Sequence, residues 1–387
     1  MELQALTTRA KHVCKYKSVL NWGREDVRRE GKAVAADLEE LSDGKLDNLR
    51  CLHSLYSLLG DSAKVLKATE WTLAQPWCTG SSAQLEPEDA KVPSKCFAMT
   101  MSERLTALLD LGRMKQARRE FKKAVKKRIG GRKAVHWSSI YQLAPFAVPG
   151  LRAQPLWEPA AELLPLARLL EANHALIAAD LDRILADKSA QWGYGGITPT
   201  IISRGDWLSF PLLQNMVWDS AHCAVAASTC SLLRERRELV AEPSVRFAGN
   251  GLNINTSVFF ARLPPGSGLR LHPGGHNTRL DLHLPLRGVE GARISIAKGA
   301  WQSYQVGRVK AFDDSFVHAV SHNGTEDRIV LVVFMWHPDF LRTVGPEAAA
   351  AAEHEHQTCG GAAADEALEL DGVRLEEGQP PQVPKDD

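Results

Sequence analysis

The sequence has 387 residues, of which 47 are Lys or Arg and 46 are Asp or Glu, so its formal net charge is +1 at pH 7. This balance excludes a uniformly basic nucleic-acid-binding protein and a strongly acidic disordered chain. The longest strongly apolar run, residues 329–336, has eight residues, whereas a membrane helix needs about 20. The first ten residues lack the apolar core of a signal peptide. We therefore expect a cytoplasmic protein without a membrane span.

The first zone of the chain, residues 1–150, has the pattern of a helical N-terminal region. Leucines recur at helical spacing after Ser102, which predicts a helix that begins with a serine cap. A second helical pattern begins at Met114 and stops at the Gly130-Gly131 pair. Two adjacent helices suggest a bundle or a helical repeat, but the sequence shows no repeat period of about 34 residues.

The stretch from Lys115 to Lys133 is strongly basic, with ten basic residues and a single acid, Glu120. One interpretation is a basic helix that binds an acidic partner, nucleic acid or a membrane surface. The other is an ordinary solvated helix face, which we favour. Aromatic residues do not interleave with the basic ones in the way that single-stranded nucleic acid requires. If this stretch has a partner, an acidic one is therefore preferred to nucleic acid.

The second zone, residues 151–344, changes from helical to β patterns. A helix is predicted from Pro159 to Leu185, and short apolar runs with Gly- and Pro-rich turns follow from about residue 245. The zone therefore predicts an α+β protein whose strands form a sandwich or jelly roll. The predicted strands are residues 257–261, 279–284, 293–297, 307–312 and 328–336.

The third zone, residues 345–387, is an acidic tail. From Pro346 onwards it holds eleven acids, two bases and a run of alanines. Such a composition cannot bury enough apolar surface to order the chain, so we expect this tail to be disordered.

Histidines are concentrated in one part of the second zone, and imidazole is a common neutral ligand for divalent metals. His272 and His276 have the spacing of a helical ligand pair, but Pro273 and the two glycines after it exclude a regular helix. The alternative pairs His272 with His318 and adds Arg328, in the order typical of jelly-roll Fe(II) oxygenases that use 2-oxoglutarate. Histidines scattered through a core or a surface would also account for the pattern. The histidines of this stretch are His272, His276, His283, His318 and His322.

The motifs around these residues resemble the aspartyl/asparaginyl β-hydroxylase family of 2-oxoglutarate-dependent oxygenases. The most specific motif is Phe312-Asp-Asp-Ser-Phe-Val-His318, and the resemblance covers residues 259–339, with weaker similarity back to the helix after Trp157. It implies a double-stranded β-helix (jelly roll, cupin-like) as the catalytic core of residues 151–344. The other shared motifs are Pro265-Gly266, His272-Pro-Gly274, Asn277-Thr-Arg-Leu280, His283, Arg328 and Trp336-His-Pro338.

The resemblance also implies roles for individual residues. His272 and His318 would be the ligands of Fe(II). Arg328 would bind the distal carboxylate of 2-oxoglutarate, with His283 helping at the other end of that molecule. Arg279 would face the acidic or amide side chain of the substrate. The cofactors implied are thus Fe(II), the cosubstrate 2-oxoglutarate and O2.

Residues beside the implied ligands carry a second set of expectations. Gly274 stands two residues after the first histidine, where most related oxygenases have a carboxylate ligand, and the family shares this glycine. Asp313 and Asp314 are expected to support the site without binding the metal. A carboxylate there could orient His318, or an Asx-turn could precede the strand.

Three departures from the family pattern concern the pocket. Asp281 replaces a basic residue, apolar Val217 and Trp218 stand where the family tends to have Arg, and Ala261 replaces a Ser that contacts the cosubstrate carboxylate. The first two departures are expected to remove positive charge from the substrate pocket. Losing one charge-assisted hydrogen bond costs roughly 1.5–3 kcal/mol, which is enough to change the choice of substrate.

The sequence thus predicts an Fe(II)- and 2-oxoglutarate-dependent dioxygenase that hydroxylates a carbon centre, preferably in Asp or Asn side chains of a peptide or protein. Two alternatives stay open: a small-molecule hydroxylase of the same class, and a non-catalytic binding or scaffold protein that retains the jelly roll. Luminal family members can join the pair matched by Cys223 and Cys230 as a disulfide. Because no signal peptide is predicted, we expect two reduced cysteines on one helix face.

Overall fold

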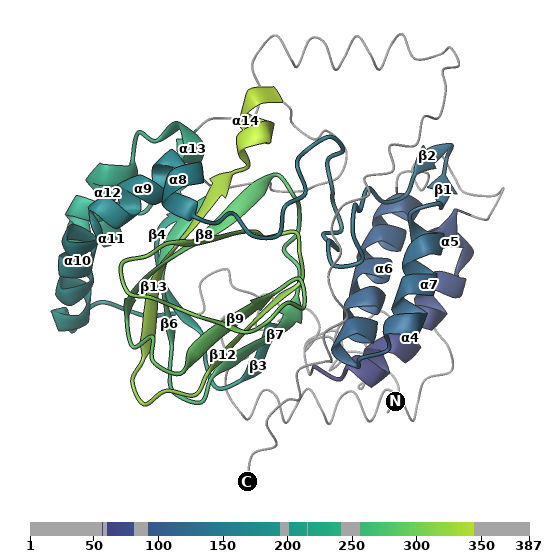
Figure 1. Ribbon diagram of the computed structural model, residues 1–387, viewed down its shortest axis with the longest axis horizontal. Coiled ribbons are helices and arrows are strands. Elements are labelled where there is room, and N and C mark those ends of the chain that lie inside the picture. The colour runs from purple at the N-terminus through teal and green to yellow at the C-terminus, as the bar shows by residue number, and fades with distance from the viewer. Residues whose placement is uncertain are drawn as a thin grey trace, which may run out of the picture.

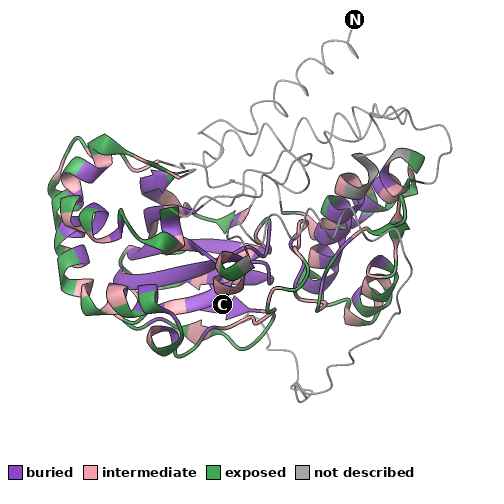
Figure 2. Cartoon of the chain, turned by 90° about the horizontal axis from the view of Figure 1, so that it is seen from above, coloured by how far each residue is buried: buried purple, intermediate pink, exposed green. Residues whose placement is uncertain are grey.

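The described part of the chain is a two-sheet β-sandwich with helices packed against the outer face of each sheet (Figure 1). In Figure 2 the strands form the buried layer, and the helix surfaces that face away from them are exposed. The acidic tail predicted for residues 345–387 lies outside the described residues. The computed structural model describes residues 56, 60–80, 92–193, 201–214, 216–240 and 256–343.

One sheet has five antiparallel strands in the order β10-β9-β12-β7-β3. Its centre is the pairing of β7 (Gly268–His272) with β12 (His318–His322). Neither strand is predicted from the sequence, because both are short and interrupt their apolar positions with charged, small or polar residues. The remaining strands are β3 (Ile202–Arg204), β9 (Ala292–Ile296) and β10 (Gln302–Ser303).

The other sheet has six antiparallel strands in the order β11-β8-β13-β6-β4-β5. Each of the five apolar runs predicted as strands coincides with a strand, four of them in this sheet and one, β9, in the other. The strands of this sheet are β4 (Leu208–Gln214), β5 (Val217–Trp218), β6 (Ser257–Leu263), β8 (Arg279–Arg287), β11 (Lys310–Asp313) and β13 (Arg328–Trp336).

Strand β13 shows how alternation assigns side chains to the two faces of this sheet. Val330 and Val332 pack with Phe259 on the inner face, whereas Leu331 and Val333 join the helices on the outer face. The single helix predicted from residue 159 to 185 is divided into three, because Pro165 can only begin a helix and Asn173 separates the next two segments. The helices on this side are α8 (Ala160–Leu163), α9 (Pro165–Ala172), α10 (His174–Ala186), α11 (Ser220–Val225), α12 (Ala227–Leu233) and α13 (Arg237–Val240); α14 (Pro338–Thr343) follows β13.

The N-terminal helices cover the opposite side of the sandwich. Leu271 of β7 and Val317, just before β12, belong to the same buried cluster as Leu105 and Leu108 of the longest of these helices. That helix begins at Val92, so Ser102 is not its N-cap as predicted; the Ser102 hydroxyl instead donates a hydrogen bond to the Leu143 carbonyl at 2.5 Å. The elements are α4 (Ser62–Ala74), α5 (Pro76–Thr79), α6 (Val92–Asp110), α7 (Met114–Ala124), β1 (Arg128–Ile129) and β2 (Arg132–Lys133).

An extended segment between β2 and α8 connects the two halves and borders the loop before β12. The Leu143 amide donates to the Ser315 carbonyl at 3.0 Å, and the Val317 amide donates to the Tyr141 carbonyl at 2.8 Å. Further along, Asn277 forms a reciprocal pair of hydrogen bonds with the Val148 backbone, at 2.8 and 2.9 Å. The segment therefore fixes both the residues before His318 and the turn after His272.

Two disulfides lie among the helices of the described part of the chain. Cys223 of α11 is bonded to Cys230 of α12, so the expectation of two reduced cysteines on one helix face is wrong. The chain turns between α11 and α12 at Ala226, and this turn brings the two sulfurs together. A second disulfide, which the sequence does not predict, joins Cys78 of α5 to Cys96 of α6. Disulfides are typical of proteins that fold in an oxidising compartment, which counts against the cytoplasmic prediction.

The basic stretch from Lys115 to Lys133 covers α7 and the β1–β2 hairpin. Its single acid, Glu120, binds Arg104 of α6 at 2.5 Å, so it offsets a cation outside the stretch. Within the described residues, no carboxylate pairs with the exposed basic side chains of the stretch, and the acidic partner stays a prediction. No helix in the described part of the chain is long and apolar enough to cross a membrane. The exposed basic residues are Lys115, Arg118, Arg119, Lys122, Lys123, Lys126, Arg128, Arg132 and Lys133.

The disulfides lead to the first prediction. Non-reducing peptide mapping should recover both cross-linked pairs, and the Cys223→Ser/Cys230→Ser variant should lose about 2–4 kcal/mol of unfolding free energy, because a cross-link restricts the unfolded chain. Reductant should destabilise this variant further through the remaining Cys78–Cys96 bond. Recovery of all four cysteines as free thiols from protein purified without reductant would contradict the prediction.

Candidate functional site

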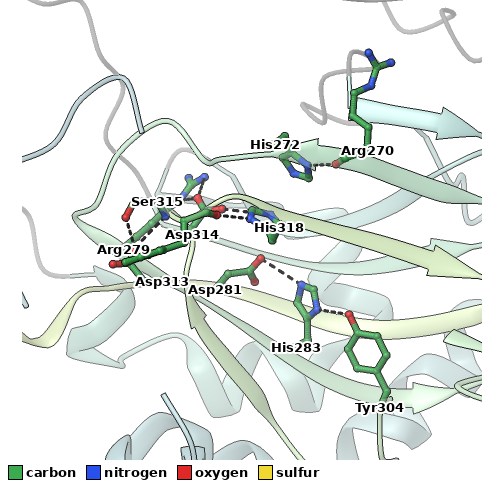
Figure 3. Close-up of polar contacts among 11 residues, drawn as sticks. Arg270, His272, Arg279, Asp281, His283, Tyr304, Asp313, Asp314, Ser315 and His318 are labelled. Carbon is green, nitrogen blue, oxygen red and sulfur yellow. Dashed lines mark hydrogen bonds and ion pairs between the residues drawn. The ribbon is translucent and has the colours of Figure 1, made fainter. Parts of the chain in front are cut away.

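The site is built around two histidines on adjacent strands. His272 ends β7, His318 begins β12, and the register of the two strands pairs them directly. Their ring centroids are 4.2 Å apart. Both side chains point into the space between the two sheets, as Figure 3 shows. The pair predicted from the sequence is therefore brought together.

Backbone hydrogen bonds fix the orientation of both imidazole rings. The Nδ1 atom of His272 lies 2.7 Å from the Arg270 carbonyl oxygen, and that of His318 lies 2.9 Å from the Phe316 carbonyl oxygen. Because a carbonyl oxygen only accepts, each Nδ1 carries the proton and each Nε2 has a free lone pair. Burial and, to a smaller extent, the neighbouring His318 lower the pKa of His272 to about 3, so His272 is neutral.

The Asp314 carboxylate lies beside the two histidines, in the space next to Gly274, which has no side chain. Asp314 places Oδ1 3.9 Å from Nε2 of His318. A Cβ atom built on Gly274 would lie 1.9 Å from Oδ2 of Asp314, so this carboxylate occupies the space that a side chain at residue 274 would need. The glycine after His272 is thus required by packing.

Arg279 holds the Asp314 carboxylate in place. Its Nε and NH2 donate to Oδ2 of Asp314 at 2.8 and 2.7 Å, and its guanidinium lies 4.0 Å from the centre of the Phe334 ring. Burial alone would raise the pKa of Asp314, but the charges of Arg279 and His318 and the hydrogen bond from Arg279 lower it overall. Arg279 lines the cavity as predicted, yet two of its donors are already used.

The adjacent Asp313 has a different role. Its Oδ1 accepts hydrogen bonds from the Ser315 amide at 2.9 Å and the Ser315 hydroxyl at 2.6 Å, which is the Asx-turn considered from the sequence. Burial raises the pKa of Asp313 to about 7. The Asx-turn is therefore present at Asp313, whereas the Phe316 carbonyl orients the His318 ring and Asp314 lies 3.9 Å from its Nε2.

Arg328 and His283 line the far end of the cavity, and Tyr304 contacts both of them without lining it. The NH2 of Arg328 donates to Nδ1 of His283 at 3.3 Å, and the Tyr304 hydroxyl lies 3.1 Å from the same nitrogen. The His283 ring therefore carries its proton on Nε2, which lies 3.2 Å from Oδ2 of Asp281. Burial lowers the pKa of His283 and raises that of Tyr304 to about 12, so both are neutral. Tyr304 is outside every motif of the sequence and could not be predicted.

Arg328 is almost fully buried and keeps a donor free. It is 2% exposed, its guanidinium lies 4.2 Å from the centre of the Tyr304 ring, and its Nε has no hydrogen-bond partner. A buried guanidinium with an unused donor is suited to a planar carboxylate.

These groups line one cavity of about 370 Å³ between the sheets. Ala261 lies in its wall, so the position that departs from the family's Ser faces the cavity. Val217 and Trp218 do not line it, and their lack of positive charge leaves the charge of the cavity unchanged, contrary to the expectation. The lining includes Trp207, Gln214, Ser257, Phe259, Ala261, His272, Gly274, Arg279, Asp281, His283, Asp314, His318, Arg328, Val332 and Phe334.

Two other histidines of the predicted group are structural. His276 is buried and its Nδ1 lies 2.7 Å from the Thr278 hydroxyl, while Nε2 of His322 lies 2.6 Å from the Glu326 carbonyl. Within the described residues, no group of three or more His, Cys, Asp or Glu side chains is arranged to hold a metal ion. A candidate metal centre would therefore use His272 and His318, with Asp314 beside them.

Fold and site together define a class: a β-sandwich protein with a pair of histidines and a carboxylate inside a cavity between its sheets. Residues 171–338 match the family described as Aspartyl/Asparaginyl beta-hydroxylase. The mouse protein called Aspartyl/asparaginyl beta-hydroxylase is 31% identical over 214 residues, which are 54% of this chain and 27% of that protein. The human protein of the same name is also 31% identical, over 54% of this chain and 26% of its own length.

Human Aspartate beta-hydroxylase domain-containing protein 2 is 30% identical over 35% of this chain and 34% of its own length. A solved prolyl-4-hydroxylase of Pseudomonas putida aligns over 42% of this chain and 87% of its own, with 13% identity and a TM-score of 0.27. The chain thus spans about a quarter of the length of its mouse and human hydroxylase relatives. Residues 171–338 are therefore similar to the aspartyl/asparaginyl β-hydroxylase family.

The fit between Gly274 and Asp314 gives the second prediction. Gly274→Ala should displace Asp314 and lower the unfolding free energy by about 1–3 kcal/mol, the usual cost of overpacking. Gly275→Ala is a matched control, because a Cβ there meets nothing within 4 Å, and it should change stability by less than about 0.5 kcal/mol. Urea unfolding of the two variants measures both effects, and equal stabilities would disprove the fit.

Proposed function

We propose that the protein is an Fe(II)- and 2-oxoglutarate-dependent dioxygenase that hydroxylates a carbon centre, preferably in an Asp or Asn side chain of a peptide or protein. The single observation that carries the proposal is the cavity with His272 and His318 at one side and Arg328 at its far end. The match of residues 171–338 to a hydroxylase family supports it. We further propose the domain division 1–150, 151–344 and 345–387.

The order of the strands supports a double-stranded β-helix as the catalytic core. Along the chain, β6, β8, β11 and β13 enter the six-stranded sheet, while β7, β9, β10 and β12 enter the five-stranded sheet. The chain therefore crosses repeatedly between two facing antiparallel sheets, as a jelly roll does. Such a fold places residues from both sheets around one interior cavity.

The chemistry of the donor set fits iron. Two neutral imidazoles with free Nε2 lone pairs are suitable ligands for Fe(II), and two protein ligands would leave further positions for the cosubstrates. Asp314 adds a carboxylate beside them, which could accept a hydrogen bond from water bound at the centre. When bound with 2-oxoglutarate and O2, the iron would supply oxidative decarboxylation to succinate and CO2, coupled to insertion of one oxygen atom into a substrate C–H bond.

The residues of this chain would bind and orient the cosubstrate and the substrate, and they would exclude water from the cavity. Arg328 would bind the distal carboxylate of 2-oxoglutarate through its free Nε donor. His283 contacts the Arg328 guanidinium, so it would support this end of the cosubstrate and not the other end, which the family resemblance implies. Phe259, Val332 and Phe334 supply apolar walls that limit access of water. Arg279 would contact the substrate near the cavity mouth, since it is partly exposed there.

The third prediction tests the metal centre. His318→Ala should abolish both stoichiometric Fe(II) binding and the release of succinate from 2-oxoglutarate. His322→Gln is a matched control on the same strand, because its amide can still donate to the Glu326 carbonyl, and it should retain both properties. Anaerobic metal titration and succinate assays measure the outcome. If wild type binds neither iron nor 2-oxoglutarate, the enzyme proposal fails and a non-catalytic binding protein is favoured.

The fourth prediction concerns the cosubstrate. Arg328→Lys keeps the charge but loses the planar fork, so the Kd for 2-oxoglutarate should rise by about tenfold or more, while Fe(II) affinity is unchanged. Isothermal titration of the metal-loaded protein under anaerobic conditions gives both constants. An unchanged Kd for 2-oxoglutarate would place its distal carboxylate elsewhere. Comparing succinate release with peptide and metabolite panels separates a peptide hydroxylase from a small-molecule hydroxylase.

A further inference from the structure

The charged side chains that line the cavity balance each other and are not equally available. The described lining has two cations, Arg279 and Arg328, and two carboxylates, Asp281 and Asp314. Arg279 directs two donors to Asp314 and lies over the Phe334 ring. Arg328 is at the far end, where the proposed function uses it for 2-oxoglutarate. Asp281 is then the charged group of the lining that has one oxygen without a hydrogen-bond partner.

Asp281 lines the cavity and keeps one carboxylate oxygen without a hydrogen-bond partner among the described residues. The residue is 4% exposed, and its Oδ2 accepts from Nε2 of His283 at 3.2 Å. Its other oxygen, Oδ1, is buried without a hydrogen-bond partner. Figure 3 shows the carboxylate between the His318 and His283 side chains. An unsatisfied buried acceptor of this kind costs free energy, and a ligand that brings a donor removes that cost.

The cosubstrate cannot provide this donor. At neutral pH, 2-oxoglutarate carries two carboxylates and a keto oxygen, all of which only accept hydrogen bonds. Its carboxylates would be attracted to Arg328 and repelled by Asp281. Apart from water, a donor for Oδ1 therefore has to come from the second organic molecule in the cavity, which is the substrate.

We propose that Asp281 selects substrates whose reacting side chain brings an N–H donor, such as a carboxamide or an ammonium group, and disfavours those that bring a free carboxylate. The inference rests on the proposed function, because it assigns Arg328 to 2-oxoglutarate. Within the Asp and Asn side chains proposed above, it favours Asn. A carboxylate substrate would place a second anion beside Asp281, and the paired Arg279 could offset that charge only in part.

The fifth prediction tests this selection. Peptide pools with random flanks and a central Asn, Lys or Asp are compared by substrate-dependent succinate release, in wild type and in Asp281→Asn. Wild type should prefer the Asn or Lys pool to the Asp pool by about tenfold or more, the value of one charge-assisted hydrogen bond. Asp281→Asn keeps an acceptor for His283 and places an NH2 donor in the cavity, so its preference should shift towards the Asp pool. If the Asn pool gives more succinate than the Lys pool, the donor is an amide; the reverse result identifies it as an ammonium group.

Two controls separate this inference from the proposed function. Asp182→Asn removes an exposed carboxylate that pairs with Arg287 outside the cavity, and it should keep the wild-type preference. Fe(II) and 2-oxoglutarate binding are titrated in every variant, and Asp281→Asn should bind 2-oxoglutarate at least as tightly as wild type, because an anion is removed. Absence of 2-oxoglutarate binding in wild type would defeat the proposed function itself.

Several outcomes would overturn the inference while the proposed function stands. One is a wild-type preference for the Asp pool, or equal turnover of all pools. Another is an unchanged preference in Asp281→Asn. Loss of Fe(II) or 2-oxoglutarate binding in that variant would show that Asp281 serves the cofactors, and failure of every pool despite 2-oxoglutarate binding would exclude peptide donors.

Discussion

The pairing of β7 with β12 is the constraint on which the site depends. It sets His272 directly opposite His318, although the two residues are 46 positions apart in the sequence. The ring orientations come from the same backbone, since each Nδ1 is held by the carbonyl two residues earlier. Strand register therefore determines both the position and the tautomer of the two imidazoles, and a shift of one residue would turn them out of the cavity.

The outer face of these strands explains how the register is held. Leu271 and Val317 are the neighbours of the two histidines in the chain, so alternation points them away from the cavity and into the cluster of the N-terminal helices. The segment that binds the Ser315 and Val317 backbone adds polar contacts on the same side. The helical region thus has a physical role in the site, although the family match at residues 171–338 does not include it.

Much of this arrangement can be predicted from the sequence, and what is missed has a common cause. The apolar runs identified as strands are strands, and the motifs locate His272, His318 and Arg328 correctly in one cavity, because strand periodicity and motif order are local signals. The hydrogen bond from Ser102 to Leu143 and the disulfide between Cys78 and Cys96 join separate segments, which local patterns do not predict. Tyr304 illustrates the limit, since a lone tyrosine near a short strand carries no signal of its contact with His283.

The cavity also shows why single positions of such a site cannot be interpreted separately. Gly274 alone suggests a missing carboxylate, but the Asp314 carboxylate fills that space from the loop before β12. Arg279 alone suggests an open anion site, but the same Asp314 uses two of its donors. Gly274, Arg279 and Asp314 therefore have to be considered together. The charged group of the lining that still has an oxygen without a partner among the described residues is then Asp281. The choice of substrate therefore depends on which charged side chains of the cavity are already paired. The net charge of the cavity alone does not predict this choice.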